Sequence, residues 1–306
     1  MSYTNQQLLT RVQAAVKAIT TTGLDESILV PEQRDRFLLA METRAPMLAD
    51  VRRITMASFE SHIDRLTYTQ ILDVPAAEGQ EFTADVDPDT FTNKLAAVKV
   101  RGRTNVSDEA MQDNIAREGF EETLVDAIGA QAGVDLEKLY VQGDTGGSGY
   151  LALTDGWLVK AGQQIDDTDY DETDVEDLFE SMMLAVDDRF LTDRGQLRFW
   201  VPFAIENDYR NVLRERGTDL GDRAQVQDSP VAYKGIPVRT TPAMPGGRAL
   251  LAHLNNTVYG VWREISIETE RKASHDRTDF HVRARTDAHY EDENAAAVAT
   301  GYTGPA

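Results

Sequence analysis

The strongest constraint on the architecture comes from residues 107–140, SDEAMQDNIAREGFEETLVDAIGAQAGVDLEKLY. Ser107 is a good N-cap residue, and the two acidic residues after it suit the positive end of a helix. The apolar residues that follow at helical spacing include Met111, Ile115, Leu124 and Ile128. We therefore predict one long helix from Ser107 to Tyr140, about 50 Å in length. A helix this long suggests a spine on which other segments lie.

The chain before this helix contains two extended segments joined by a polar excursion. Apolar residues gather near Ile63 at one end and near Leu95 at the other, whereas residues 75–89 are rich in Ala, Glu, Gly, Asp and Pro. We predict a protruding hairpin over residues 59–104, because long loops are uncommon inside compact domains and are usually functional. Residues 1–58 contain short, polar helical patterns, so we predict an arm that needs a partner surface.

The chain after the helix mixes helical and extended patterns. A glycine loop at residues 143–149 and an acidic connector at 166–174 lead to a capping box, Thr173 with Glu176, which predicts a helix to Val186. Extended segments are predicted at 197–201, 236–239, 249–254, 258–267, 280–284 and 295–299, with a helix at 204–214 and a polar loop at 217–229. Helices and strands in separate blocks indicate the α+β class.

The chain is strongly acidic. Lys and Arg number 31, of which only 7 are Lys, against 52 Asp and Glu, so the formal net charge is −21 over 306 residues. This balance disfavours a protein that reads nucleic-acid grooves, because phosphate contact needs a positive face. So acidic a chain repels itself in dilute salt, and screening over about 3 Å at molar salt removes most of that repulsion. Composition therefore suggests a strongly saline cytoplasm, with an ordinary acidic soluble protein as the alternative.

Other residue types exclude further classes. The chain has no cysteine, which excludes disulfides, thiolate metal sites and cysteine nucleophiles. It has no apolar run long enough for a membrane span, so we expect no membrane partner. Its polar N-terminal residues lack the pattern of a secretory signal.

One stretch, GDTGGSG at residues 143–149, resembles enzyme motifs. Asp-Thr-Gly is the catalytic turn of aspartic proteases, but that chemistry needs two carboxylates sharing a proton, and the chain has no second such turn. Thr145 stands where a serine-protease nucleophile would be, and the Lys-Ser/Thr of a P-loop is absent. We favour a plain turn, and predict no catalytic residue and no cofactor.

Three acidic residues of the connector have the odd spacing of a calcium loop. They are Asp167, Asp169 and Asp171, but Glu172 replaces the required Gly and Leu178 the final Glu. We favour a solvated acidic linker, with weak cation binding as the alternative. The five histidines show no close metal spacing, so no firm metal site is predicted.

Five short stretches occur in an order typical of one family of viral shell proteins. They are residues 51–56 (VRRITM), 106–113 (VSDEAMQD), 143–144 with 149–151 (GD and GYL), 234–238 with 243–245 (KGIPV and AMP), and 265–267 with 283–287 (ISI and RARTD). Together with the order of the arm, hairpin, spine helix and terminal strands, they resemble the major capsid proteins of tailed viruses (caudoviruses) that have the Hong Kong 97-type fold.

The resemblance implies an α+β, Hong Kong 97-like capsid fold with four parts. Residues 1–58 would be the N-terminal arm, and residues 59–104 the extended loop (E-loop) with its strands. Residues 105–165 and 255–289 would form the peripheral (P) domain, and residues 166–254 and 290–306 the axial (A) domain. The arm is too short for a fused scaffolding domain, so a separate scaffold protein, or none, is implied. Portal and decoration proteins are further implied partners.

The resemblance also implies residues that contact neighbouring subunits. In the E-loop they are Pro75, Glu78, Glu81, Phe82, Asp85, Asp89, Phe91 and Lys94, and in the loop facing the capsomer axis they are Thr218, Asp219, Asp222 and Arg223. Some family members join a loop Lys to an Asn of the adjacent P domain, and Lys94 is the only Lys between Val30 and Val98. The alternative for Lys94 is an exposed charge.

The function expected from this resemblance is assembly. The chain would form homo-oligomeric pentamers and hexamers that close an icosahedral shell around packaged double-stranded DNA, without binding that DNA specifically. Its place would be the virion, after assembly in the host cytoplasm, and the acidic composition adds a halophilic archaeal host. Two alternatives remain: an encapsulin-type compartment of the same fold, and an aspartic-protease-like hydrolase.

Overall fold

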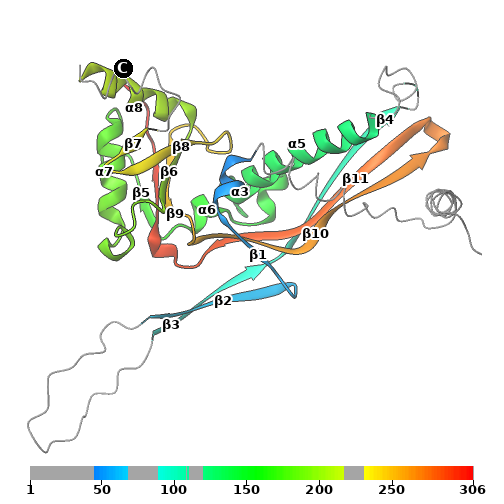
Figure 1. Ribbon diagram of the computed structural model, residues 1–306, viewed down its shortest axis with the longest axis horizontal. Coiled ribbons are helices and arrows are strands. Elements are labelled where there is room, and N and C mark those ends of the chain that lie inside the picture. The colour runs from blue at the N-terminus through cyan, green and yellow to red at the C-terminus, as the bar shows by residue number, and fades with distance from the viewer. Residues whose placement is uncertain (1–44, 68–88, 108, 110–119, 217–230, 306) are drawn as a thin grey trace, which may run out of the picture.

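The computed structural model describes residues 45–67, 89–107, 109, 120–216 and 231–305. These residues form two lobes and a projecting hairpin (Figure 1). One lobe contains a four-stranded sheet in the order β1-β10-β11-β4, and the other a six-stranded sheet in the order β5-β12-β9-β6-β8-β7. The hairpin is a separate two-stranded sheet of β2 and β3. Among the described residues, no helix is long and apolar enough to cross a membrane.

The first lobe is built on a long antiparallel ribbon with a helix along it. β10 (Thr257–Lys272) pairs with β11 (Arg277–Tyr290), which pairs in turn with β4 (Val98–Ser107). β1 (Arg52–Thr55) runs parallel to β10, just after the short helix α3 (Pro46–Asp50). α5 (Phe120–Gln142) lies along this ribbon (Figure 1).

The predicted long helix is described from Phe120 onward, as α5, whereas residues 108 and 110–119 of its predicted first part lie outside the described residues. Ser107 is the last residue of β4 and lies opposite Arg277 of β11. Strand β4 also crosses the boundary predicted at residue 104 between the hairpin segment and the P domain.

The second lobe contains the six-stranded sheet and two helices on one of its faces. Its strands are β5 (Gln163–Ile165), β6 (Leu197–Val201), β7 (Ala232–Tyr233), β8 (Ile236–Thr240), β9 (Arg248–His253) and β12 (Ala296–Thr300). Its helices are α7 (Val175–Ala185) and α8 (Phe203–Glu215), and the short α6 (Trp157–Lys160) lies between the two lobes (Figure 1). Four short 3-10 turns complete the described elements: Gly149–Leu153, Asp188–Phe190, Ala273–His275 and Glu293–Ala295.

The predicted capping box at the start of α7 is wrong by one residue. Asp174 is the N-cap, and its carboxylate accepts a hydrogen bond from the Glu176 amide at 2.8 Å. Thr173 instead donates its amide and hydroxyl to Asp171. Asp has at least the capping strength of Thr, so the adjacent residue takes the position. The predicted strands at 197–201, 236–239, 249–254 and 295–299 and the helix at 204–214 are confirmed within a residue or two.

The six-stranded sheet is buried on both faces, and this joins the lobes. Side chains alternate between the two faces of a strand. Phe199 and Leu251 belong to the core under α7 and α8, whereas Trp200 and Leu250 belong to the core that contains Tyr140 of α5. The core that contains Tyr140, Trp200 and Leu250 therefore extends from the six-stranded sheet to the four-stranded sheet, and the two lobes share it.

The hairpin packs on the ribbon through a small third core. β2 (Glu60–Thr67) pairs antiparallel with β3 (Asp89–Ala96), so the two paired arms predicted from the sequence are confirmed. Met56 and Leu95 lie over β10 at Gly260, where a Cβ atom would come within 2.8 Å of Met56 Sδ and 3.0 Å of Leu95 Cδ1. A larger residue at this position would require the ends of these two side chains to shift.

The buried carboxylate of Glu137 connects the short helix α3 to both lobes. Glu137 of α5 is 2% exposed and accepts hydrogen bonds from the amides of Met47, at 3.1 Å, and Leu48, at 3.4 Å. Its other oxygen accepts from the Thr241 hydroxyl, just after β8. Burial raises the pKa of Glu137, and the hydrogen bonds from Thr241, Leu48 and Met47 oppose that rise.

We predict that Glu137→Ala lowers the free energy of unfolding by about 3 kcal/mol, because it leaves two amides and a hydroxyl without their buried acceptor. Glu137→Gln should cost less than about 1.5 kcal/mol, since its amide can still pair with both sides. Urea unfolding of the unassembled chain measures both effects. An equal loss in the two variants would contradict the role of the hydrogen bonds.

Glu137 also makes the free energy of unfolding depend on pH, in a direction that follows from the shift of its pKa. The pKa of Glu137 is higher in the folded chain than its ordinary value of 4.5, so its contribution to stability increases as pH falls through the folded pKa and is complete below 4.5. The stability difference between the wild type and Glu137→Gln should therefore shift in favour of the wild type on acidification.

Candidate functional site

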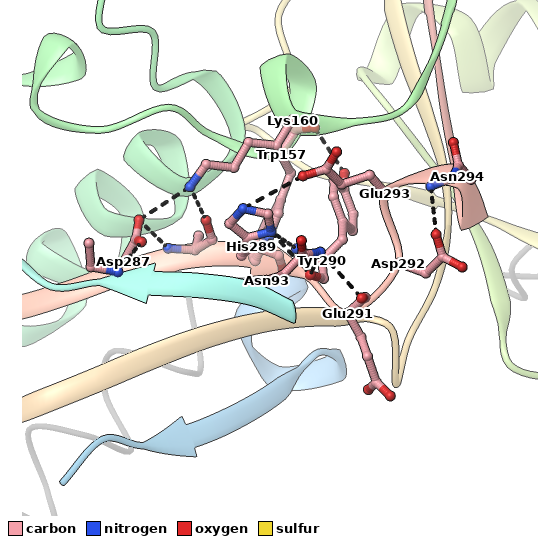
Figure 2. A network of polar contacts seen from close by, with 12 residues as sticks. Asn93, Trp157, Lys160, Asp287, His289, Tyr290, Glu291, Asp292, Glu293 and Asn294 are labelled. Atoms are coloured by element: carbon pink, nitrogen blue, oxygen red, sulfur yellow. Dashed lines mark hydrogen bonds and ion pairs between the residues drawn. The ribbon is translucent and has the colours of Figure 1, made fainter. Parts of the chain in front are cut away.

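The end of β11 and the link to β12 form a polar junction where the hairpin and both lobes meet. Figure 2 shows this junction, residues 287–294, with Asn93 of the hairpin and Trp157 and Lys160 of α6. One of the covalent links between the two sheets, from β11 to β12, passes through these residues. Their contacts therefore fix how the three parts are placed.

Asp287 is the most connected residue of the junction. It is 3% exposed, and one carboxylate oxygen accepts from the Ala96 amide of β3 at 2.8 Å. The other oxygen accepts from the Thr154 hydroxyl at 2.8 Å and the Ala288 amide at 2.9 Å, and lies 3.4 Å from Lys160 Nζ. Lys160 also donates to the Ala288 carbonyl at 2.7 Å. This one side chain joins the hairpin, the ribbon and α6.

Hydrogen bonds from two aromatic residues attach α6 to strand β11. Tyr290 donates its hydroxyl to the Trp157 carbonyl at 2.9 Å, and Trp157 returns a hydrogen bond from its indole to the His289 carbonyl at 3.2 Å. His289 Nε2 lies 3.7 Å from a Glu293 carboxylate oxygen. Burial, followed by the nearby Lys160 charge, lowers the pKa of His289 below its ordinary value of 6.5.

Both strands of the hairpin are bound to the junction. Asn93 of β3 donates to the Tyr290 carbonyl at 2.9 Å and the Glu291 carbonyl at 3.3 Å. Arg65 of β2 forms an ion pair with Asp292, whose amide donates to Asn256 at 2.7 Å. All these contacts hold backbone and side chains in position, as in a structural joint.

The glycine loop forms a turn that is closed by hydrogen bonds to Asp144 and Asp155. Asp144 accepts from the Gly146 amide at 2.8 Å, and Asp155 accepts from both the amide and the hydroxyl of Thr145 at 2.8 Å. These hydrogen bonds lower the pKa of Asp155. The threonine hydroxyl is thus a donor to a carboxylate within the turn, in agreement with the predicted plain turn.

A groove of about 570 Å³ separates α5 from β4 and β11. Its walls are largely apolar, with Val100, Ile128 and Leu136 among them. Its charged lining residues are Arg101, Arg103 and Asp135, which do not make a nucleophile–base pair.

The acidic connector uses its carboxylates on its own backbone. Asp169 accepts from the Asp166 amide at 3.2 Å, and Asp171 from the Thr173 amide at 3.0 Å. In the described part of the chain, the group with metal-ligand proximity is a different one, Glu270 with Asp279 and His281. There, Lys272 Nζ lies 2.8 Å and Arg277 Nε 3.0 Å from Asp279, so protein cations already neutralise that carboxylate.

Three of the predicted inter-subunit residues lie on β3. Asp89 begins the strand, Phe91 is 58% exposed, and Lys94 forms an ion pair with Glu60 of the same hairpin at 2.7 Å. The other predicted contacts lie outside the described residues: Pro75, Glu78, Glu81, Phe82, Asp85, Thr218, Asp219, Asp222 and Arg223. The sequence analysis did not identify the junction. Its one local signal is a run of polar residues, RTDAHYEDEN, between two apolar strand patterns.

Comparison with known proteins identifies the class that this fold defines. Residues 26–301 match the model of the phage capsid family, so the chain belongs to that family. It is a capsid protein, a structural component of the virion shell, and its family and structural neighbours are structural proteins.

Individual relatives agree with this assignment. The chain is 27% identical to the putative prophage capsid protein YqbE of Bacillus subtilis (strain 168), over 96% of this chain and 97% of that one. Its fold is similar to that of a chain from the satellite phage P4 procapsid that includes the size determination (Sid) protein, with a TM-score of 0.61 at 12% identity, covering 98% and 99% of the two chains. A chain of Mycobacterium phage Adephagia gives 0.60 at 15% identity, covering 86% and 91%. The curated relative is bacterial, so the comparisons do not support the archaeal, halophilic origin expected from composition.

We predict that Asp287→Ala loosens the hairpin from the body, since the Ala96 amide and the Lys160 ammonium both lose a buried partner at a cost of about 3 kcal/mol. Hydrogen exchange should show faster exchange at Ala96 and Ala288. Asp64→Ala is the matched control, because Asp64 accepts from Thr92 on the exposed part of the same hairpin. Equal acceleration of the Ala96 amide in the control would contradict the assigned role.

We also predict that acid weakens the junction through His289. Its pKa is lower in the folded chain than 6.5, so its contribution to stability is complete above 6.5 and is lost as pH falls through the folded pKa. In His289→Asn, the side-chain oxygen can replace Nδ1 as acceptor of the Tyr290 amide, which lies at 2.9 Å. Thermal unfolding between pH 7 and 5 should show a smaller loss for the variant, and parallel curves would refute the prediction.

Proposed function

We propose that this chain is the major capsid subunit of a tailed virus and assembles in the Hong Kong 97 manner. Pentamers and hexamers would close an icosahedral shell around packaged double-stranded DNA. The shell would enclose this DNA without binding it specifically. The four-stranded lobe would be the P domain, the six-stranded lobe the A domain, and the β2–β3 hairpin with residues 68–88 the E-loop. A separate scaffold, a portal and decoration proteins would be its partners.

The observation that carries this proposal is the projecting hairpin. A two-stranded ribbon is marginally stable alone in water. Here β2 and β3 are held by the third core and, through Asn93 and Arg65, by the junction, and the ribbon projects from the body toward its Thr67 and Asp89 end (Figure 1). Phe91 on this ribbon is 58% exposed, so it offers apolar surface for a contact between subunits. A neighbouring subunit would supply the missing contact.

Other exposed apolar side chains support an incomplete subunit. Leu184 on α7 is 78% exposed and Phe203 at the start of α8 is 73% exposed, both on the six-stranded lobe. Contacts on the hairpin and on this lobe would be individually weak, and would sum over many copies to a stable shell.

The negative charge bears on the conditions of assembly. Each copy carries a formal charge of −21, so packing many copies together costs repulsion that salt screens. We propose that the subunit is adapted to high salt, as in a virus of a halophilic host, on composition alone.

We predict uniform polyhedral particles, or rings of five and six, in negative-stain micrographs of the protein in about 2 M salt, where the screening length is near 3 Å or below. The particles should loosen in dilute buffer. Equal stability at both salt concentrations would contradict the salt adaptation, and monomers at every salt concentration, with a scaffold protein also supplied, would contradict the assembly.

The cargo of such particles separates the proposal from its alternative. Nuclease-protected DNA in particles from infected cells would support a viral capsid, whereas enclosed enzymes would indicate an encapsulin-type compartment.

A further inference from the structure

Strand β4 forms an outer edge of the four-stranded sheet and is long for an edge strand. It contains ten residues, Val98–Ser107, and pairs with β11 on one side. Alternate residues of such a strand direct their N–H and C=O groups away from the partner strand. Residues 101–105 are all exposed, and within the described ranges no second strand pairs with this edge. The edge is therefore a template on which a strand of another chain could pair.

An apolar groove adjoins this edge. It is the groove of about 570 Å³ between α5 and strands β4 and β11, and Val100, Ile128 and Leu136 are among its lining residues. Val100 and Val106 pack on the core beside α5. A strand that paired with β4 would direct every second side chain to the same face as this groove. Pairing between two β4 strands would therefore gain both hydrogen bonds and apolar burial.

The other face of β4 carries cations. Lys99, Arg101 and Arg103 alternate with the residues that face α5, so their side chains point away from the groove. The strand contains no carboxylate, although Asp and Glu outnumber Lys and Arg by 52 to 31 in the whole chain. Its charge is thus opposite in sign to that of the chain around it.

These cations lower the stability of the sheet. Arg101 lies directly opposite Arg283 of β11, and Lys99 lies opposite Arg285. Like charges in directly opposite positions destabilise a sheet. Glu268 of β10 lies 2.9 Å from Arg283, whereas Lys99 and Arg101 have no carboxylate within ion-pair distance in the described part of the chain. A residue pattern that costs stability indicates a gain of another kind, such as specificity.

The alternation along β4 decides what happens when the edges of two copies meet. Directly opposite residues of an antiparallel pair direct their side chains to the same face. A register that keeps Val98 and Val100 of both copies on one face therefore brings the cations of both copies together on the other. In the register centred on residue 101, Arg101 of one copy would face Arg101 of the other, and Lys99 would face Arg103. A shift by one residue would instead place the valines of one copy among the cations of the other.

We propose that Lys99, Arg101 and Arg103 prevent the β4 edge from pairing with the β4 edge of a second copy. Their mutual repulsion and their loss of hydration offset the gain from hydrogen bonds and from covering the groove. The inference goes beyond the proposed function, because it concerns the single chain before any assembly. It leaves other surfaces of the molecule to make the contacts between copies.

Removal of the charges tests the proposal. The variant with Lys99→Thr, Arg101→Thr and Arg103→Thr keeps side chains that suit a strand but lacks the repulsion. Since β4 has one open edge, the expected product is a dimer. In dilute buffer, we expect the dimer fraction to be at least about fivefold larger than for the wild type at the same concentration. Sedimentation velocity measures this fraction and separates dimers from shells.

Hydrogen exchange locates the contact in these dimers. Amides of residues 98–107 should exchange more slowly in the dimer than in the single chain, because the outward N–H groups of β4 become paired. An unchanged dimer fraction in the threonine variant, or dimers without this protection, would overturn the proposal.

The stability of the threonine variant tests the cost assigned to the cations. Its midpoint of urea unfolding, measured at a dilution at which it is a single chain, should be higher than that of the wild type, since the like-charge pairs with Arg283 and Arg285 are gone. A lower midpoint, or a variant that does not fold, would overturn this part of the inference.

A variant of opposite charge separates repulsion from a general effect of substitution. With Lys99→Glu, Arg101→Glu and Arg103→Glu, like charges still meet when two edges pair, so this variant alone should dimerise no more than the wild type. Mixed in equal amounts with the wild type it should form mixed dimers, because opposite charges then face each other. Dimers of the glutamate variant alone, or no dimers in the mixture, would overturn the role of charge.

The matched control removes the same number of cations at another place. Arg214 of α8, Arg239 of β8 and Arg248 of β9 are exposed, and both strands lie inside their sheet. Their replacement by Thr should leave the dimer fraction at the wild-type level. An increase equal to that of the β4 variant would overturn the assignment to this edge.

Discussion

One buried carboxylate, Asp287, contacts the hairpin, the ribbon and α6 at once. It stands in β11 and binds the hairpin through Ala96, the loop before α6 through Thr154, and α6 through Lys160. A buried charge is tolerable only when its hydrogen-bonding capacity is filled, and four donors around Asp287 provide this. The placement of the hairpin relative to the body therefore depends on this desolvated group together with Asn93, Arg65 and the third core.

The two lobes do not behave as separable domains, because the six-stranded sheet contributes to both large cores. Trp200 and Leu250 pack on the α5 side, while Phe199 and Leu251 pack under α7 and α8. Glu137 adds a second link between the lobes, because it connects α5 to the short helix α3 and to Thr241, just after β8. In a shell, this arrangement would transmit a force from one lobe directly to the other. The hairpin would receive such a force mainly through the junction.

Much of the fold was predictable because its signals are local. The strands at 197–201 and 249–254 and the terminal ribbon show apolar periodicity in the sequence itself, and the two arms of the hairpin could be recognised from the polar stretch between them. The long helix was predictable over its described part, α5, from apolar residues at helical spacing, and the residues predicted to begin it lie outside the described part of the chain. The junction was not predicted, since Asp287 meets Ala96 and Thr154, which lie 191 and 133 residues away along the chain.

The hairpin packs closely against β10 at Gly260. A Cβ atom at this position would come within 2.8 Å of Met56 Sδ and 3.0 Å of Leu95 Cδ1, so both side chains would have to shift to admit a larger residue. From this point β3 extends for about 20 Å to Asp89. The bulk of the side chain at residue 260 would thus influence the direction in which the hairpin projects from the body.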